Sequence, residues 1–325
     1  MKVLVSGAGG FLGRHVVDTL LARGHRVRAI VRPGSTEPAW PDTVERFRAD
    51  LRVHDGLLSA FEDIDAVVHL AAATSGDEDI QFSSSVMATE RFLEAMSKSK
   101  AKRLIFISSL VVYDWAKARG VLDEQTPLHR NVYDMGPYTI AKVWQERTVS
   151  RFAAANSLEL TIMRPGFIWG DNHTELAGMG RRYGQVYLMF GPLTRLPLSH
   201  VVNCADCLVA AVENPASAGE TLNVVDGDDI RVWRYVRECI RRRGHRGIMV
   251  PLPYRAGLGI AYLALLTSRI LFGSRGKLPS ILMPRRFESQ FKPVRFSNRK
   301  LRDVLNWTPP VSFDDCLDLS FRPTT

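Results

Sequence analysis

The 325-residue sequence predicts an α/β fold, a doubly wound parallel sheet that carries a smaller C-terminal lobe. Two observations lead to this fold class. Short apolar runs rich in β-branched residues alternate with amphipathic stretches of helix length through the first half of the chain. In addition, a glycine-rich segment, SGAGGFLG at 6–13, directly follows the first apolar run. In open sheets of this class, ligands bind beyond the carboxyl ends of the strands.

The expected elements follow one another along the chain. Strands are expected at 2–7, 26–32, 65–72, 103–109, 158–165 and 220–225, and helices at about 11–21, 84–99, 138–155 and 204–213. After Pro165 glycine, proline and arginine become frequent and the alternation weakens. We therefore expect a Rossmann dinucleotide-binding domain at 1–165, completed by about 198–226, and a mainly substrate-binding lobe at 166–325.

The segment 6–13 spaces three glycines equally between a strand and a helix. Residues without a Cβ let the backbone approach a pyrophosphate, which then lies at the helix N-terminus. A tight structural turn alone would not require this spacing. We therefore predict a dinucleotide site here. The residues expected to form it are Gly7, Gly10, Phe11, Leu12 and Gly13.

The end of the second expected strand bears on which nicotinamide cofactor is used. Proteins of this type often carry an acid there that holds the adenosine ribose hydroxyls. This strand ends instead in Val31 and Arg32, and a guanidinium can grip a 2′-phosphate with two hydrogen bonds. NADP(H) is therefore favoured over NAD(H). Asp50, followed by Leu51, is well placed to accept a hydrogen bond from the adenine amino group.

The segment YTIAK at 138–142 places Tyr138 and Lys142 on one helix face. Alone, this spacing arises often by chance and favours an ordinary surface pair. However, Ser108 and Ser109 end an expected parallel strand, at the edge where ligands bind. An ammonium about 4 Å from a phenol is worth about 4 kcal/mol at an effective dielectric constant of about 20. We therefore expect Lys142 to lower the pKa of Tyr138 from about 10 toward neutral pH, where a general acid/base works best.

These features together resemble the extended branch of the short-chain dehydrogenase/reductase superfamily, which includes nucleotide-sugar epimerases, dehydratases and reductases. The motifs that carry the resemblance are GAGGFLG at 7–13, ADL at 49–51, HLAA at 69–72, SSLVVYD at 108–114, YTIAK at 138–142, MRPGFIWG at 163–170, HVVNCADC at 200–207 and LRDVLNWTPP at 301–310. They cover nearly the whole chain.

The resemblance implies a role for each catalytic candidate. Ser109 would orient the substrate oxygen, Tyr138 would be the acid/base, and Lys142 would hold the nicotinamide ribose. Further cofactor contacts are implied within the matching motifs, at Leu51, Ala71, Ala72 and Pro165.

The chain departs from the family pattern at three places. Ser85 stands where an asparagine is frequent, and Asp114 follows the VVY motif where glycine is common. Leu110-Val111 stands where sugar 4,6-dehydratases carry an acidic pair. The last departure argues against dehydration of a sugar by that route.

Two substrate classes are compatible with the resemblance. In the first, which we favour, the enzyme acts on a nucleotide-sugar carbon. The pairs Arg181-Arg182 and Arg285-Arg286 would neutralise the diphosphate, and Asn172 would line the sugar site. In the second, the substrate is an uncharged ketone or alcohol, as in steroid-dehydrogenase and dihydroflavonol-reductase relatives. AIVRPG at 29–34 and the apolar stretch 256–272 resemble those branches.

A third hypothesis belongs to another class, that of a cofactor-sensing protein without catalysis. The intact set of Ser109, Tyr138 and Lys142 argues against it. The resemblance also implies a homodimer, since relatives of the extended branch often pair through two helices.

The composition narrows the setting. The net charge of +9 comes with arginine clusters but without aromatic interleaving or a nucleic-acid motif, so an anionic small molecule is a better partner than DNA. Four cysteines are too few for a disulfide framework and favour a reducing, cytoplasmic compartment. Cys204 and Cys207 lack a second ligand pair, so no metal is expected.

The apolar stretch at 256–272 has 17 residues and contains Arg269, which is short of the about 20 residues that span a bilayer. We expect a buried helix. Because basic residues flank the stretch, attachment to a membrane surface is the alternative.

Overall fold

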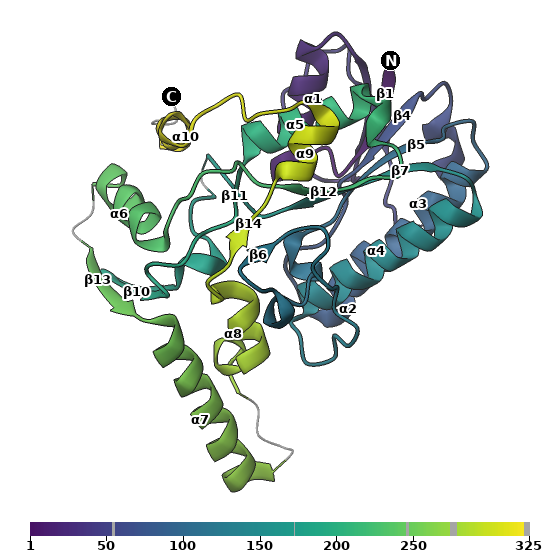
Figure 1. Cartoon of the computed structure of the whole chain (residues 1–325). Coiled ribbons are helices and arrows are strands. Elements are labelled where there is room, and N and C mark those ends of the chain that lie inside the picture. Colours follow the sequence, from purple (N-terminus) through teal and green to yellow (C-terminus); the bar gives the residue numbers. More distant parts are fainter. Residues whose placement is uncertain (54–55, 172, 245–246, 274–277, 322–325) are drawn as a thin grey trace.

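The computed structural model describes residues 1–53, 56–171, 173–244, 247–273 and 278–321, and a seven-stranded parallel sheet runs through its middle (Figure 1). Its strand order is β3-β2-β1-β4-β5-β7-β12, the doubly wound arrangement expected from the sequence. The strands are β1 (Lys2–Ser6), β2 (Arg26–Val31), β3 (Glu45–Arg48), β4 (Ala66–His69), β5 (Arg103–Ile107), β7 (Glu159–Pro165) and β12 (Thr221–Val224).

Helices cover both faces of this sheet, which explains why its strands are apolar without alternation. Along β1, Val3 and Val5 face one core while Leu4 faces the other, and all three are fully buried. The first face carries α1 (Phe11–Ala22), α5 (Val201–Glu213) and α9 (Arg299–Leu305). The second face carries α3 (Ala88–Ser97) and α4 (Pro137–Ala155), preceded by α2 (Glu78–Phe82) and a π-helical turn at Ser83–Met87.

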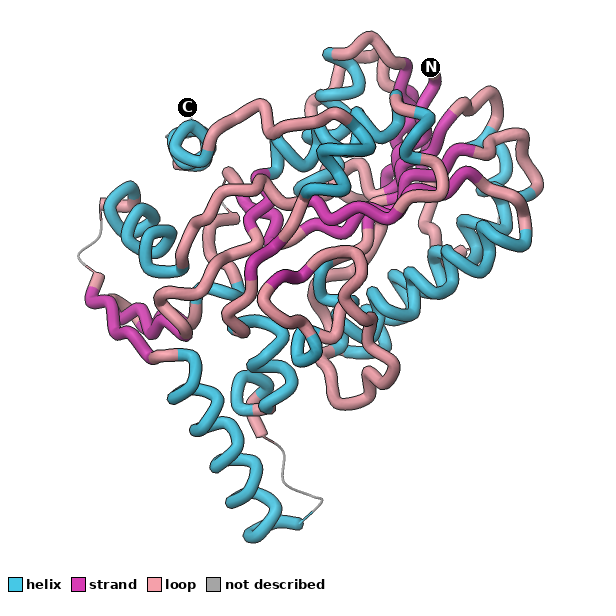
Figure 2. The backbone as a smooth tube through the Cα atoms, viewed as in Figure 1, coloured by secondary structure: helices cyan, strands magenta, loops and turns pink. Residues whose placement is uncertain are grey.

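The remaining elements form the C-terminal lobe and its connections (Figure 2). They are β6 (Val121–Leu122), β8 (Phe167–Trp169), β9 (Arg181–Tyr183), β10 (Val186–Phe190), β11 (Leu198–His200), α6 (Val232–Arg242), β13 (Ile248–Leu252), α7 (Tyr254–Phe272), α8 (Pro284–Phe291), β14 (Arg295–Phe296) and α10 (Phe313–Ser320). The strands pair as β13-β10-β9, β11-β8 and β14-β6.

The chain returns to the main sheet after entering this lobe. β12 pairs in parallel with β7, aligning Leu222 with Met163. α5 packs beside α1 on the same face. The strand expected at 220–225 and the helix expected at 204–213 are therefore confirmed.

Two expectations were incomplete or wrong. β3 was missed because its sequence, ERFR, is polar and lies at the sheet edge, where only one side of the strand is paired. The helix at 256–272 is not buried, because α7 projects from the body of the molecule (Figure 1). Its residue Leu263 exposes 61 % of its surface. No helix in the described part of the chain combines the length and apolarity needed to cross a bilayer.

Candidate active site

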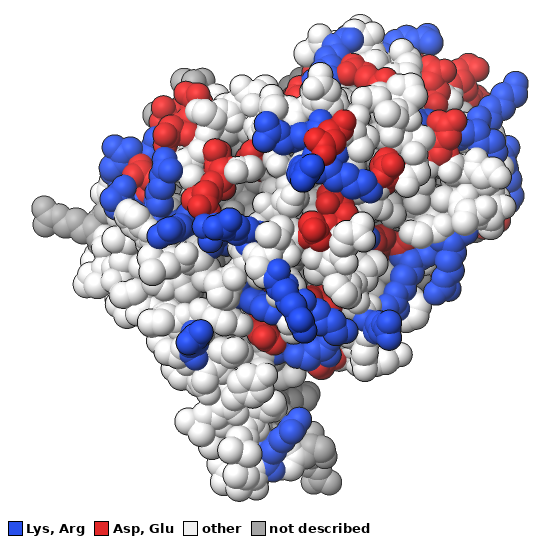
Figure 3. Space-filling view, in the orientation of Figure 1, with Lys and Arg blue, Asp and Glu red and all other residues white. Residues whose placement is uncertain are grey.

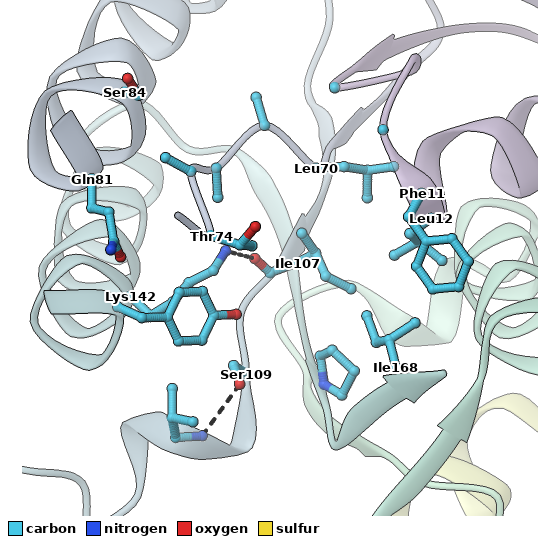
Figure 4. Close-up of a pocket in the computed structure, with 18 of the residues that line it drawn as sticks. Phe11, Leu12, Leu70, Thr74, Gln81, Ser84, Ile107, Ser109, Lys142 and Ile168 are labelled. Atoms are coloured by element: carbon cyan, nitrogen blue, oxygen red, sulfur yellow. Dashed lines mark hydrogen bonds between the residues drawn. The ribbon is translucent and has the colours of Figure 1, made fainter. Parts of the chain in front are cut away.

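A cavity of about 1050 Å³ follows the carboxyl ends of the central strands. It begins at the glycine turn after β1, passes the ends of β2, β4 and β5, and reaches the C-terminal lobe. In the close-up of Figure 4, Phe11 and Leu12 lie on one side of the cavity, and Lys142 and Ser109 on the other. The first group belongs to the glycine turn, and the second to the expected catalytic set.

The glycine turn has a separate structural reason for each glycine. Gly7 has a φ of +70°, and a Cβ there would lie 2.9 Å from the amide nitrogen of Ala71. Gly13 lies in the first turn of α1, and a Cβ there would collide with the carbonyl oxygen of Gly7 in the preceding turn. Gly10 differs, because its added Cβ would meet nothing closer than that same oxygen, at 3.2 Å. Gly10 lines the cavity and caps α1, so the space above it fits a pyrophosphate at a helix N-terminus.

The ends of β2 and β3 form a charged corner of the cavity. Arg32, Asp50 and Arg52 all line it. The Arg52 guanidinium donates two hydrogen bonds to the Asp50 carboxylate, from Nη2 at 2.6 Å and from Nε at 3.0 Å. These hydrogen bonds from Arg52, together with the nearby charge of Arg32, lower the pKa of Asp50 to about 2. Leu51, also in the lining, places an apolar side chain in the same corner.

Arg28 has a structural role. Its guanidinium donates to Glu45 on β3 and to the carbonyl oxygens of Ala60 and Glu62. Arg28 therefore stabilises the edge of the sheet, whereas Arg32 at the end of β2 lines the cavity.

Ser109 and Tyr138 meet at the carboxyl end of β5. The Ser109 Oγ accepts a hydrogen bond from the amide of Val111 at 3.3 Å and also bonds the Tyr138 side chain. Burial raises the pKa of Tyr138, and the Ser109 bond offsets this only in part. The phenol is therefore protonated at neutral pH, which differs from the lowering by Lys142 that the spacing predicted.

The position of Lys142 explains this difference. Its ammonium donates to the carbonyl oxygen of Ile107 at 3.0 Å (Figure 4) and to Oε1 of Gln145, also at 3.0 Å. Burial lowers the pKa of Lys142 to about 7, although the carboxylate of Glu146 opposes the shift. Glu146 is itself held by a buried ion pair with Arg164 at 2.5 Å.

A buried chain of hydrogen bonds connects Lys142 to the glycine turn. Gln145 donates to Thr89 Oγ1 at 2.8 Å, Thr89 pairs with Nε2 of His69 at 2.8 Å, and Nδ1 of His69 pairs with Ser6 Oγ at 2.6 Å. Burial lowers the pKa of His69 to about 3, so its ring stays neutral. Sequence reasoning missed this chain. The one available clue was that Gln145 follows Lys142 by three residues on the same helix face.

Further residues expected from the sequence also line the cavity. These are Phe11, Leu12, Ala71, Ala72 and Pro165. Phe11 also stacks on His173, with ring centroids 4.0 Å apart, which joins the glycine turn to the C-terminal lobe.

The arginines of β9 that were expected to bind substrate do not line the cavity. Arg181 and Arg182 lie on the exposed strand β9, and neither belongs to the cavity lining. The Arg182 guanidinium bonds Glu175 and the carbonyl oxygen of Gly184. Asn172 lies outside the described residues. Of the two arginine pairs expected at a diphosphate, the one member that lines the cavity in the described part of the lobe is Arg286 on α8.

Fold and site together define a dinucleotide-dependent α/β enzyme with a serine, a tyrosine and a lysine in one cavity. The model of the NAD dependent epimerase/dehydratase family matches residues 3–225, and the chain belongs to this family. The resemblance expected from the motifs is thereby confirmed.

Individual proteins similar to this chain fall into two groups. A 3 beta-hydroxysteroid dehydrogenase/Delta 5-->4-isomerase of Mycobacterium tuberculosis is 28% identical over 95% of this chain and 86% of its own length. A ketoreductase of Stigmatella aurantiaca, named for a farnesyl-bearing dihydroquinoline oxide, is 27% identical over 81% of this chain and 79% of its own. Among solved structures, a UDP-glucuronic acid 4-epimerase from Bacillus cereus in complex with NAD matches with a TM-score of 0.74 and 20% identity, covering 99% of this chain and 96% of that one. At that identity, the likeness concerns the fold.

Proposed function

We propose that this enzyme interconverts a ketone and a secondary alcohol on a largely apolar substrate, with NADP(H) as its cofactor. The observation that carries the substrate class is the lining beyond Ser109 and Tyr138. The apolar residues there are Leu110, Val111, Trp115, Met135, Phe167, Ile168, Leu176, Ala177 and Pro197. A site lined in this way favours an apolar body with one polar group at the reacting carbon.

The residues divide the chemistry among them. When bound, the nicotinamide supplies or accepts the hydride. The Tyr138 hydroxyl, protonated because burial raises its pKa, gives its proton to the carbonyl oxygen of a ketone and takes it back in the reverse direction. Ser109, which bonds the Tyr138 side chain, would turn its single O–H to the same oxygen when a substrate binds, while its Oγ still accepts from the backbone amide of Val111. Lys142, fixed by Ile107 and Gln145, would hold the nicotinamide ribose.

The preference for NADP(H) rests on the charged corner. Arg32 lines the cavity at the end of β2, followed by Ser35 and Thr36, and no carboxylate stands at that strand end. These groups suit a 2′-phosphate.

The cofactor preference is tested by calorimetry. NADPH should bind at least several-fold tighter than NADH, and Arg32→Asp should erase or reverse that difference. Arg48→Asp makes the same charge change at an exposed arginine outside the lining and should leave the ratio unchanged. Tighter NADH binding to the unmodified chain would contradict the proposal.

A second candidate function, epimerisation or reduction of a nucleotide sugar, is supported by Arg286. Its guanidinium lines the cavity while donating to the carbonyl oxygens of Asp134 and Met135, and it retains further N–H groups for a diphosphate.

The two substrate classes are separated by turnover. Purified enzyme is supplied with NADPH and either apolar ketones (a ketosteroid and a long-chain β-keto ester) or UDP-sugars, and products are identified by mass spectrometry. We expect alcohol formation from the apolar ketones. Epimerised or reduced UDP-sugar without ketone reduction would establish the second function instead.

A further inference from the structure

The helix α7 presents an apolar face to the outside of the molecule. Six large apolar residues lie within about half of the helix circumference at 3.6 residues per turn. They are Ile260, Tyr262, Leu263, Leu266, Ile270 and Leu271. Ile270 and Leu271 each expose 72 % of their surface. A surface helix of a water-soluble domain normally places polar side chains there.

The opposite face of α7 is already occupied by the protein. Gly257, Ala261 and Ser268 are buried on that side. The Phe287 ring of α8 lies so close to Gly257 that an added Cβ would be 2.5 Å from it, and it stacks on Tyr254 at 5.9 Å. The outward apolar residues are therefore not a core waiting for α8. They form a second face with no protein element of the described chain against it.

The apolar face continues at the N-terminal side of the helix. The strand β13 directly precedes α7, and its first three residues are exposed, with Ile248 at 62 %. We call the exposed apolar residues of β13 and α7 the outer face. In Figure 3 the projecting part of the molecule is almost entirely white, with blue patches and no red on the side shown.

The segment of chain that carries the outer face is basic, and the nearest acid in sequence on its C-terminal side, Glu288, bonds the Tyr254 side chain at the start of α7. Residues 239–287 contain ten lysines and arginines and no aspartate or glutamate. Two of the arginines, Arg255 and Arg269, lie on α7 itself, at the border of its exposed apolar half. Several others are neutralised by acids from elsewhere in the chain, as Arg285 is by Asp134 at 2.6 Å.

We propose that the outer face docks on the surface of a bilayer that contains anionic lipids. Its apolar side chains would enter the boundary between headgroups and acyl chains, and Arg255 and Arg269 would meet the lipid phosphates. A second copy of the chain is a poorer occupant. A two-fold interface would bring the same basic, acid-free segment against itself and place like charges together.

Docking in this way would set the cavity wall close to the lipid. α7 packs on α8, and α8 contributes Arg286, Ser289 and Gln290 to the cavity lining. A lipophilic molecule leaving the bilayer would thus reach the cavity beside α8. The docking itself rests on the outer face alone and does not depend on which substrate the enzyme uses.

The test is co-sedimentation of the full chain with vesicles of phosphatidylcholine, with and without phosphatidylglycerol. We expect binding to the mixed vesicles, weakened by high salt. The variant Leu263→Glu/Leu266→Glu/Ile270→Glu should bind at least about tenfold more weakly, because three inserted apolar side chains become charged. The matched control is Leu58→Glu/Val121→Glu/Leu128→Glu, which alters exposed apolar residues elsewhere and should bind normally.

Folding and self-association are followed on the same samples. Circular dichroism and thermal melting should be similar for all three proteins, since every changed side chain is exposed. Equal vesicle binding by the two variants would overturn the proposal, as would failure of the unmodified chain to bind. A dimer in light scattering that the first variant abolishes, without vesicle binding, would assign the outer face to a second copy instead.

Discussion

The two ends of the cavity are built in different ways. One end, where we propose that the cofactor binds, is formed by one continuous turn and the ends of adjacent strands, and we call it the cofactor end. Its shape depends on the backbone at Gly7, Gly10 and Gly13. The other end, where we propose that the substrate binds, is the substrate end. Its side chains come from the loop after β5, from β8, from the segment at 175–177 and from α8, which are spread over more than a hundred residues of sequence. The cofactor end therefore permits few residue types, while the substrate end can change without altering the sheet.

The largest expected effect lies where the two ends meet. Tyr138→Phe removes the oxygen that transfers the proton but keeps the ring, so turnover should fall by about 10²–10⁴ while cofactor affinity stays nearly constant. Steady-state kinetics and cofactor titration measure both quantities. Tyr133→Phe, at a phenol exposed by 83 %, is the control and should leave turnover unchanged. Near-normal turnover of the Tyr138 variant would exclude it as the acid/base.

Two glycine variants at the cofactor end separate the effect on dinucleotide binding from the effect on folding. Gly10→Val fills the space above the turn, so dinucleotide binding should be lost while the melting temperature changes little. Gly13→Ala should lose both dinucleotide binding and thermal stability, because its Cβ would collide with the carbonyl oxygen of Gly7 in the turn that precedes α1. Calorimetry and thermal melting distinguish the two. Unchanged cofactor affinity in Gly10→Val would show that this turn does not hold the pyrophosphate.

The buried Lys142 should make the free energy of unfolding depend on pH. Burial lowers its pKa from 10.5 to about 7, so between these values the unfolded chain binds more protons than the folded chain. The free energy of unfolding of the unmodified chain, relative to Lys142→Met, should therefore rise by up to about 1.4 kcal/mol per pH unit within that window. Below pH 7 the difference should be constant, because Lys142 is protonated in both states.

Urea unfolding without cofactor at several pH values between 6 and 10 measures this difference. Lys98→Met, at an exposed lysine, controls for the loss of a surface charge. The same pH dependence in both variants would contradict a buried, perturbed Lys142.

The smallest effect is expected at the exposed arginines of the lobe. Arg181→Ala/Arg182→Ala should change KM by less than about twofold, because neither side chain belongs to the cavity lining. Arg286→Ala should change KM more, since it alters the wall itself. A large KM increase in the double variant would mean that β9 contacts the substrate.

The features of the cofactor end could largely be predicted from the sequence. Apolar runs and the glycine spacing are local patterns, and they identified six strands of the main sheet and the position of the turn. Tyr138 and Lys142 were recognisable because one helix carries both. These patterns could be read because each requirement falls within a few consecutive residues.

Long-range contacts were not predictable in this way. The sequence suggested Arg286 together with Arg181, Arg182 and Arg285, and could not tell which of the four lines the cavity. That choice depends on how α8 returns to the first domain, and no local spacing encodes that path. The expectation for 256–272 failed for a related reason. Apolar composition predicted a helix correctly, but it cannot say whether protein, water or lipid lies against each side of it.

The buried chain of hydrogen bonds from Ser6 to Lys142 affects how many protons the enzyme takes up when the cofactor binds. His69 stays neutral, and the amide of Gln145 donates to Thr89, so its oxygen is left to face Lys142. An ammonium has three N–H groups, and two are used by Ile107 and Gln145. A neutral amine has only those two and nothing left to donate to a ribose hydroxyl. Above pH 7 we therefore expect cofactor binding to draw one proton from solution, which buffers of different ionisation enthalpy would reveal in calorimetry.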